Sequence, residues 1–182
     1  MGWGGEYNIG SFKFHCGFCG SIVASDRGFQ DNQAIKRIFL CPHCDKPSFF
    51  DGFGSQVPGV APGNNIGHLP SELETLYNEA RQCVSVTAYT ASVLACRKLL
   101  MHIGVEQKAD QGKNFIYYVE YLANNGFVPP NGKGWVDHIR KKGNEATHEI
   151  VLMKKEDAEE LISFAEMLLK FIYEFPARIP TV

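Results

Sequence analysis

Long hydrophobic runs are missing from this sequence, and their absence narrows the classes of protein to which the chain can belong. No apolar stretch is long enough to span a bilayer, so we expect no transmembrane helix. The first residues lack the basic and apolar regions of a signal peptide, and we therefore expect a cytoplasmic protein. An excess of one charge is also missing. The net charge is -2, so the chain as a whole offers no basic field that would attract nucleic acid.

The common sequence signatures of nucleotide chemistry are absent as well. The chain has neither a Walker loop nor a GxGxxG pattern, and no group of carboxylates resembles the metal site of a nuclease. Two features remain that are unusual. One is a group of four cysteines near the N-terminus, and the other is a polar segment within an otherwise apolar helical region.

The four cysteines form two Cys-x-x-Cys pairs, Cys16 with Cys19 and Cys41 with Cys44. Two such pairs at this separation are typical of a structural zinc site, in which four thiolates close a tetrahedral shell. We therefore predict one structural Zn²⁺ per chain. A redox motif needs only one pair, and disulfides are disfavoured in a reducing cytoplasm, but both stay as alternatives. A further alternative exchanges one cysteine ligand for an adjacent histidine.

The N-terminal third is predicted to be a small β zinc ribbon that covers residues 1–52. Its short strands are expected at Phe12–His15, Arg37–Leu40 and Ser48–Phe50. So few residues cannot bury much of a core, and zinc binding, worth about 10 kcal/mol in small metal domains, would be the main stabilising contribution. Residues 53–70 are rich in glycine and proline and are expected to form an extended linker.

Residues 71–182 have the hydrophobic periodicity of helices. Apolar side chains recur at intervals of three and four along one stretch, Val86, Tyr89, Val93, Cys96, Leu100 and Ile103. We expect Gly104 to end this helix. Other helices are predicted near 72–84, 115–122, from 133 onward and at 156–174. Four or five helices of this length can bury one core, so we predict a mainly α protein in which a helical bundle follows the small ribbon.

The most polar part of the bundle sequence is residues 140–149. On a continuous helix Arg140, Asn144 and His148 would lie on one face at intervals of four. Arginine binds phosphate through a charged donor fork, histidine exchanges protons near neutral pH, and asparagine can orient a histidine or bind a base. Together they suit metal-independent RNA cleavage, in which a 2′-hydroxyl attacks the adjacent phosphorus. Lys141 and Lys142 are weaker candidates for phosphate binding.

The same polar residues also have a structural interpretation. A Gly-Asn pair can mark the end of a helix, His148 can bond a buried carbonyl, and three successive cations can form a solvated face. Arg97 and Lys98 are ambiguous in the same way, because they could contact phosphate or be ordinary surface charges. Composition alone does not separate these interpretations.

Three segments, VLACRKLLMHIG, IRKKGNEATHE and EDAEELISFAEMLLKFIYEFP, resemble the domain-of-unknown-function family 4145. The similarity covers about residues 71–176, and its core is Gly143, Asn144 and His148. Members of the family often carry an N-terminal CxxC ribbon, and the family is grouped with the HEPN superfamily of helical domains. The resemblance therefore implies a HEPN-like bundle. Many HEPN proteins are ribonucleases of phage-defence or toxin–antitoxin systems and act as dimers.

By this resemblance, Arg140, Asn144 and His148 would be the catalytic residues of a homodimeric endoribonuclease in prokaryotic antiviral defence. The HEPN motif places about four to six residues between arginine and histidine, whereas seven separate Arg140 from His148 and five separate Lys142 from it. This departure supports an alternative function. The chain could be a non-catalytic module that dimerises or binds a protein or nucleic-acid partner, without contact to a membrane.

Overall fold

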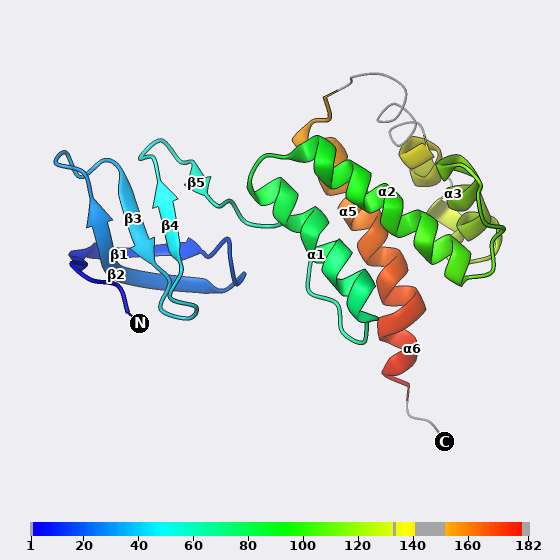
Figure 1. Cartoon of the computed structure of the whole chain (residues 1–182), viewed down its shortest axis with the longest axis horizontal. Coiled ribbons are helices and arrows are strands. Elements are labelled where there is room, and N and C mark those ends of the chain that lie inside the picture. The colour runs from blue at the N-terminus through cyan, green and yellow to red at the C-terminus, as the bar shows by residue number, and fades with distance from the viewer. Residues whose placement is uncertain (1, 133, 141–151, 180–182) are drawn as a thin grey trace. The chain divides into compact units, whose positions relative to one another are not determined.

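The computed structural model describes residues 2–132, 134–140 and 152–179. The chain divides into two compact units, Met1–Ala61 and Pro62–Val182. The first unit is built from strands and the second from helices, and Figure 1 shows the elements of each. We describe the two units one after the other.

The β unit is a five-stranded antiparallel sheet in which each strand pairs with the next one along the chain (Figure 1). Its strands are β1 Tyr7–His15, β2 Ile22–Gln30, β3 Arg37–Leu40, β4 Pro47–Phe50 and β5 Gln56–Val57. The pairing register of β1 with β2 shifts between Asn8 and Phe12, at a bulge. A sheet of this order needs only short connections, and the two Cys-x-x-Cys pairs lie in two of them.

Four phenylalanines form the centre of the β unit. Phe12 and Phe14 alternate with polar residues on β1 and so lie on one face of the sheet. Their rings pack against Phe39 of β3 and Phe50 of β4, with centroids 5.0 to 6.0 Å apart. This small aromatic cluster also contacts the cysteines. The core of the unit is therefore continuous with the cysteine cluster.

The expectation of a mainly α protein with a small β ribbon is wrong. The described residues are 46% helical and 17% strand, and the sheet is larger than a ribbon. The sequence pattern did not reveal β2, because its two buried positions are Ser25 and Gly28 rather than apolar side chains. Gly28 is required by close packing, since a Cβ there would lie 1.9 Å from the carbonyl oxygen of Ile38 on β3. The short β5 lies in the segment that we predicted as linker.

In its described residues, the helical unit has three long helices and several shorter helical segments. The elements are α1 Ser71–Ser85, α2 Tyr89–Glu106, α3 Phe115–Asn124, the 3-10 turn η1 Pro130–Gly132, helical residues 134–140, α5 Lys155–Leu169, the π-helical η2 Lys170–Glu174 and α6 Phe175–Ala177. Helices α1, α2 and α5 pack on one another, and α3 packs on α2 (Figure 1). Their interface contains fully buried side chains such as Leu99, Leu161 and Leu168. No helix in the described part of the chain is long and apolar enough to cross a membrane.

Gly104 does not end α2, contrary to expectation, because the helix continues to Glu106. A Cβ at Gly104 would lie 2.7 Å from Cδ1 of Tyr118 on α3. Tyr118 is buried, and its hydroxyl donates a hydrogen bond to the carbonyl of Asp110. The glycine therefore allows α3 to approach α2 closely.

The glycine- and proline-rich segment that precedes α1 is fixed to the helices from residue 62 onward. Glu166 of α5 accepts hydrogen bonds from the backbone and side-chain amides of Asn64, at 2.9 and 2.8 Å. Ile66 is buried in the core. Arg81 of α1 donates hydrogen bonds to Pro62, Gly63 and Asn65. This part of the predicted linker belongs structurally to the helical unit.

Candidate metal centre and candidate catalytic residues

The two Cys-x-x-Cys turns have the same backbone geometry. In the first, the N–H of Gly20 donates to the carbonyl of Cys16 at 2.9 Å, and in the second the N–H of Asp45 donates to that of Cys41 at 2.8 Å. Gly20 and Asp45 both adopt positive φ, 71° and 56°. Each turn directs two thiols toward the other turn, so the repeated motif is a repeated structure.

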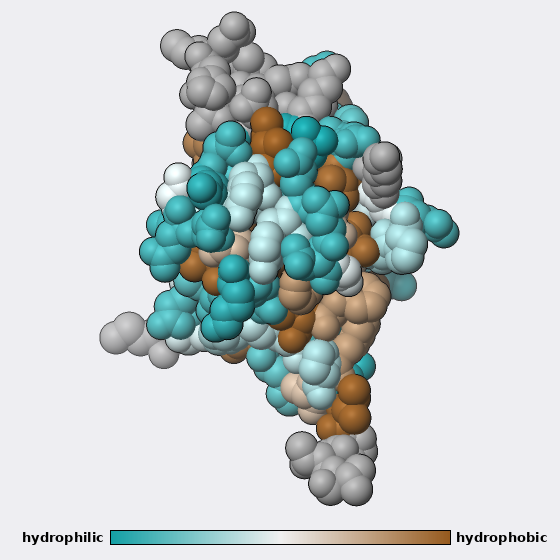
Figure 2. All heavy atoms as spheres, turned by 90° about the vertical axis from the view of Figure 1, so that its right-hand side faces the viewer, coloured by the Kyte–Doolittle hydropathy of each residue, from teal (hydrophilic) through white to brown (hydrophobic). Residues whose placement is uncertain are grey.

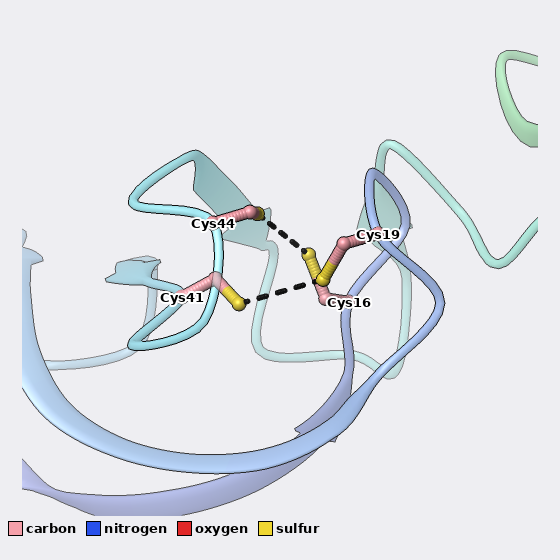
Figure 3. Close-up of side chains that lie close together, drawn as sticks. All are labelled: Cys16, Cys19, Cys41 and Cys44. Carbon is pink, nitrogen blue, oxygen red and sulfur yellow. Dashed lines mark hydrogen bonds between the residues drawn. The ribbon is translucent and has the colours of Figure 1, made fainter.

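The four cysteine sulfur atoms lie together at the meeting point of the two turns, and Figure 3 shows them directed toward one another. They are all within 4.8 Å of one another. The distance between Sγ atoms is 3.7 Å for Cys16 and Cys44 and 3.8 Å for Cys19 and Cys41. A tetrahedron with metal–sulfur bonds of about 2.3 Å has edges of about 3.8 Å. The four sulfur positions therefore fit the ligands of one tetrahedral metal ion.

The segment around β5 supports the first cysteine turn. The side-chain amide of Gln56 donates hydrogen bonds to the carbonyls of His15 and Pro58, at 2.8 and 3.0 Å. A Cβ at Gly17 would lie 2.4 Å from the carbonyl oxygen of Pro58, so only glycine fits beneath this segment. The sequence pattern did not reveal these supporting residues, because they follow a Gly-rich stretch with no periodicity.

Burial and hydrogen bonding affect the thiols in opposite directions. Burial raises the pKa of Cys16, and it raises that of Cys44 to about 12. At Cys19 burial has the same tendency, but hydrogen bonds from Ser21 and His43 outweigh it and lower the pKa to about 6. Four thiolates so close together would repel one another strongly, and a cation at their centre offsets this repulsion. The cluster is therefore suited to a metal ion.

The histidines beside the cysteines are not part of the cluster. His15 Nε2 lies within hydrogen-bonding distance of the carbonyl oxygen of Gly20. Among the residues that the structure describes, the cysteines alone form the group that can hold a metal ion.

Arg140 is the one candidate catalytic residue for which the structure gives a position. Asn144 and His148, with Lys141 and Lys142, lie outside the described residues. Arg140 is the last described residue of the helical stretch 134–140, and its guanidinium binds two carboxylates. Nη2 lies 2.8 Å from Oε1 of Glu120, which belongs to α3, and Nη1 lies 3.1 Å from Oδ1 of Asp137.

The surroundings of Arg140 form a pocket of about 350 Å³. Its apolar wall includes Val128, Pro129 and Val136. Among the described residues that line it, the charged groups are the guanidinium of Arg140 and the two carboxylates that hold it. A phosphate at this position would compete with the carboxylates that pair with Nη1 and Nη2 of Arg140, while the buried Nε of Arg140 has no hydrogen-bond partner among the described residues.

Arg97 is buried and is not a surface charge. Its side chain lies within the helical unit with 9% of the residue exposed, and its guanidinium lies 4.5 Å from the centre of the Phe115 ring. Lys98, its neighbour in sequence, instead lines a groove of about 410 Å³ together with residues of α1. The two cations therefore have different environments.

Comparison with protein families matches residues 78–181 to a domain of unknown function, DUF4145. The chain belongs to the DUF4145 family. This confirms the resemblance that the helical segments predict. No curated protein and no solved structure matches the chain.

The DUF4145 match begins within α1 and covers the other helices, including Arg97 and Arg140. The β unit and its four cysteines precede the matched residues. The cysteine cluster that could hold a metal ion therefore lies outside the residues matched to DUF4145, which are all in the helical unit.

Proposed function

We propose that this DUF4145 protein is a non-catalytic binding module, whose β unit is held together by a structural zinc ion. The observation that carries the proposal is the position of Arg140 between Glu120 and Asp137. Metal-independent cleavage of RNA requires a cation that stabilises the charge developing on phosphorus. Two carboxylates already neutralise the guanidinium that would do so, which favours a role in binding over one in catalysis.

Zinc is the metal that best suits the cysteine cluster. Thiolate ligands select soft or borderline metals, and a tetrahedral set of four sulfurs is typical of zinc or of iron–sulfur centres. Zinc has no redox chemistry, and a shell of four cysteines leaves it no open position for water or substrate. In this proposal the metal folds the β unit and takes no part in a reaction.

The proposed module acts as a homodimer and binds a protein or a nucleic acid in the cytoplasm. Figure 2 views the molecule from the side on which α3 lies in Figure 1, and this face is mainly hydrophilic. Its hydrophobic side chains occur as small spots over most of the face and as a larger group at the lower right. Contacts on this face would therefore be made largely by polar and charged side chains, as is common in transient complexes.

A second candidate function is a metal-independent endoribonuclease of the HEPN type, in a prokaryotic defence or toxin system. The spacing of Arg140, Asn144 and His148 favours it, because these residue types supply phosphate binding, orientation and proton transfer. For this function Arg140 would have to exchange Glu120 and Asp137 for a phosphate group. An Asp137→Asn variant, which weakens one of these ion pairs, should then cleave RNA faster.

Incubation of the purified chain with RNA separates the two functions. The assay contains EDTA and is kept short, so that the metal centre stays intact, and light scattering reports the oligomeric state. The binding module predicts a homodimer or a stable complex and no cleavage by the wild type. Cleavage that is lost in His148→Ala, with the helical circular dichroism unchanged, would overturn the proposal in favour of the nuclease. His138→Ala is the matched control, because His138 pairs with Glu160 at 2.8 Å and is not one of the three candidate catalytic residues.

A further inference from the structure

Two arginines of the helical unit have similar aromatic contacts but different hydrogen bonding. The guanidinium of Arg81 lies 5.5 Å from the centre of the Tyr77 ring, and that of Arg97 lies 4.5 Å from the centre of the Phe115 ring. The guanidinium of Arg81 has four oxygen acceptors at 2.7 to 3.0 Å, on Pro62, Gly63, Asn65 and Asn78. In contrast, Nη1 of Arg97 is buried and has no hydrogen-bond partner among the residues that the structure describes.

The burial of Arg97 is not offset by a carboxylate in the described part of the chain. No ion pair to Arg97 occurs there, and burial lowers the pKa of its guanidinium. Arginine stays charged in proteins, so this group cannot avoid the cost by losing its proton. A buried charge that lacks a counterion is unfavourable. The contact with Phe115 compensates for only part of this cost, since a ring face is a weaker partner than an anion.

The start of helix α3 lies next to this arginine. Phe115, whose ring the guanidinium covers, is the first residue of α3. The first N–H groups of a helix have no partners within the helix, and its N-terminus carries partial positive charge. The side chain of Asn114 accepts a hydrogen bond from one of these groups, the N–H of Tyr117. Lys113 directly precedes this cap, and its ammonium pairs with Asp110 only at 3.9 Å.

We propose that Arg97 and the N-terminus of α3 form a binding site for a phosphoryl group. The guanidinium supplies a donor fork, the helix start supplies N–H groups and partial positive charge, and Lys113 supplies a second cation at the edge. The site differs from the pocket of Arg140, where two carboxylates already pair with the guanidinium. The proposal rests on the proposed function, because it names the ligand chemistry of the binding module. The phosphoryl group could belong to an RNA backbone or to a free nucleotide.

Titration of the metal-loaded full chain with inorganic phosphate tests this site. Chloride keeps the ionic strength constant, and helical circular dichroism gives the melting temperature. We expect phosphate to raise the melting temperature of the wild type in a saturable way. Arg97→Met should abolish that rise, yet without phosphate it should be at least as stable as the wild type, because it removes a buried charge without a counterion. Arg97→Lys keeps the charge but not the fork, so we expect a smaller rise.

Arg81→Met is the matched control, since it breaks the hydrogen bonds of a fully bonded arginine. It should lower the melting temperature and leave the phosphate-dependent rise unchanged. The proposal is overturned if the wild type shows no saturable rise, or if Arg97→Met retains it. It is also overturned if the Arg97→Met variant does not fold while Arg97→Lys responds to phosphate as the wild type does.

Two further titrations identify the source of the phosphoryl group. A short RNA and a 5′-mononucleotide are added separately to the wild type and to Arg97→Met, and fluorescence anisotropy measures the affinity. If RNA is the ligand, it should bind the wild type about tenfold more tightly than it binds Arg97→Met. If only the mononucleotide depends on Arg97, a free nucleotide is the ligand. If both proteins bind RNA equally and phosphate does not raise the melting temperature, this site is refuted. The proposed binding function is not affected by that result.

Discussion

Among the carboxylates near the surface of the helical unit, we expect that of Glu166 to contribute most to the stability of the unit. It lies on α5, and its side chain is only 12% exposed. Its two oxygens accept hydrogen bonds from both amides of Asn64, from the hydroxyl of Tyr77 and from the ammonium of Lys170. One carboxylate thus joins α5 to α1 and to the segment that precedes α1. We predict that Glu166→Ala loosens all of these connections at once.

The size of the effect follows from what each donor can do after the substitution. Hydrogen bonds to charged groups contribute about 1.5 to 3 kcal/mol each. Asn64 is exposed and Lys170 is partly exposed, so both can bond water in the variant. The hydroxyl of Tyr77 can use the carbonyl oxygen of Asn64, which lies 3.2 Å away. We therefore expect Glu166→Ala to lower the free energy of unfolding by about 2 kcal/mol, and Glu166→Gln by about 1 kcal/mol.

Urea denaturation followed by helical circular dichroism measures this change in the intact, metal-loaded chain. Glu159→Gln is the control on the same helix, because Glu159 makes an exposed pair with Lys155 at 3.5 Å. An exposed pair contributes little, so the control should change the stability by less than about 0.5 kcal/mol. If Glu166→Ala were as stable as the control, the connecting role of this carboxylate would be refuted.

The pH dependence gives an independent check of the same residue. Burial alone would raise the pKa of Glu166, but hydrogen bonds from Lys170 and Asn64 outweigh it and hold the pKa below its usual value. A carboxyl with a lowered folded-state pKa contributes stability that is complete above its unfolded pKa of about 4.3. That contribution is lost as the pH falls through the folded pKa. The difference between wild type and Glu166→Gln should therefore be constant near neutral pH and shrink in acid.

Three further predictions concern the β unit and the assembly. Metal analysis should find one zinc per chain. Cys41→Ser should lose the metal and, with it, the fold of the β unit, because zinc binding contributes about 10 kcal/mol in small metal domains. Cys83→Ser, which lies outside the cluster, should retain both the metal and the fold. Gly28→Val should unfold the β unit at lower urea concentration, because its side chain would displace the strand that carries Ile38, whereas Ala24→Val on the exposed face should not. Light scattering should give the mass of a homodimer at micromolar concentration, and a monomer at all concentrations would contradict this assembly.

The helices and the cysteine cluster were predictable because each has a local sequence signal. Apolar residues at intervals of three and four indicated α1, α2, α3 and α5, and paired Cys-x-x-Cys motifs indicated a common metal site. Strand β2 has no such signal. Its buried positions carry Ser25 and Gly28, and the small residue at Gly28 reflects the nearness of a neighbouring strand rather than a local preference. The prediction that Gly104 ends α2 was wrong for the same reason, because the role of this glycine depends on Tyr118 of another helix.

The limits of prediction are clearest for the charged residues. Sequence spacing shows which side chains share a helix face, and on that basis Arg140 is a candidate for phosphate binding while Arg97 is ambiguous. Spacing does not show what a different helix contributes. Glu120 comes from α3 and neutralises Arg140, whereas the residue that α3 places against Arg97 is Phe115, which has no charge. Among the described residues, the same helix therefore supplies a carboxylate to Arg140 and only an uncharged ring to Arg97. Since a permanent charge must be balanced by protein or by ligand, the arginine facing the phenylalanine is the one for which a phosphoryl ligand brings the larger gain.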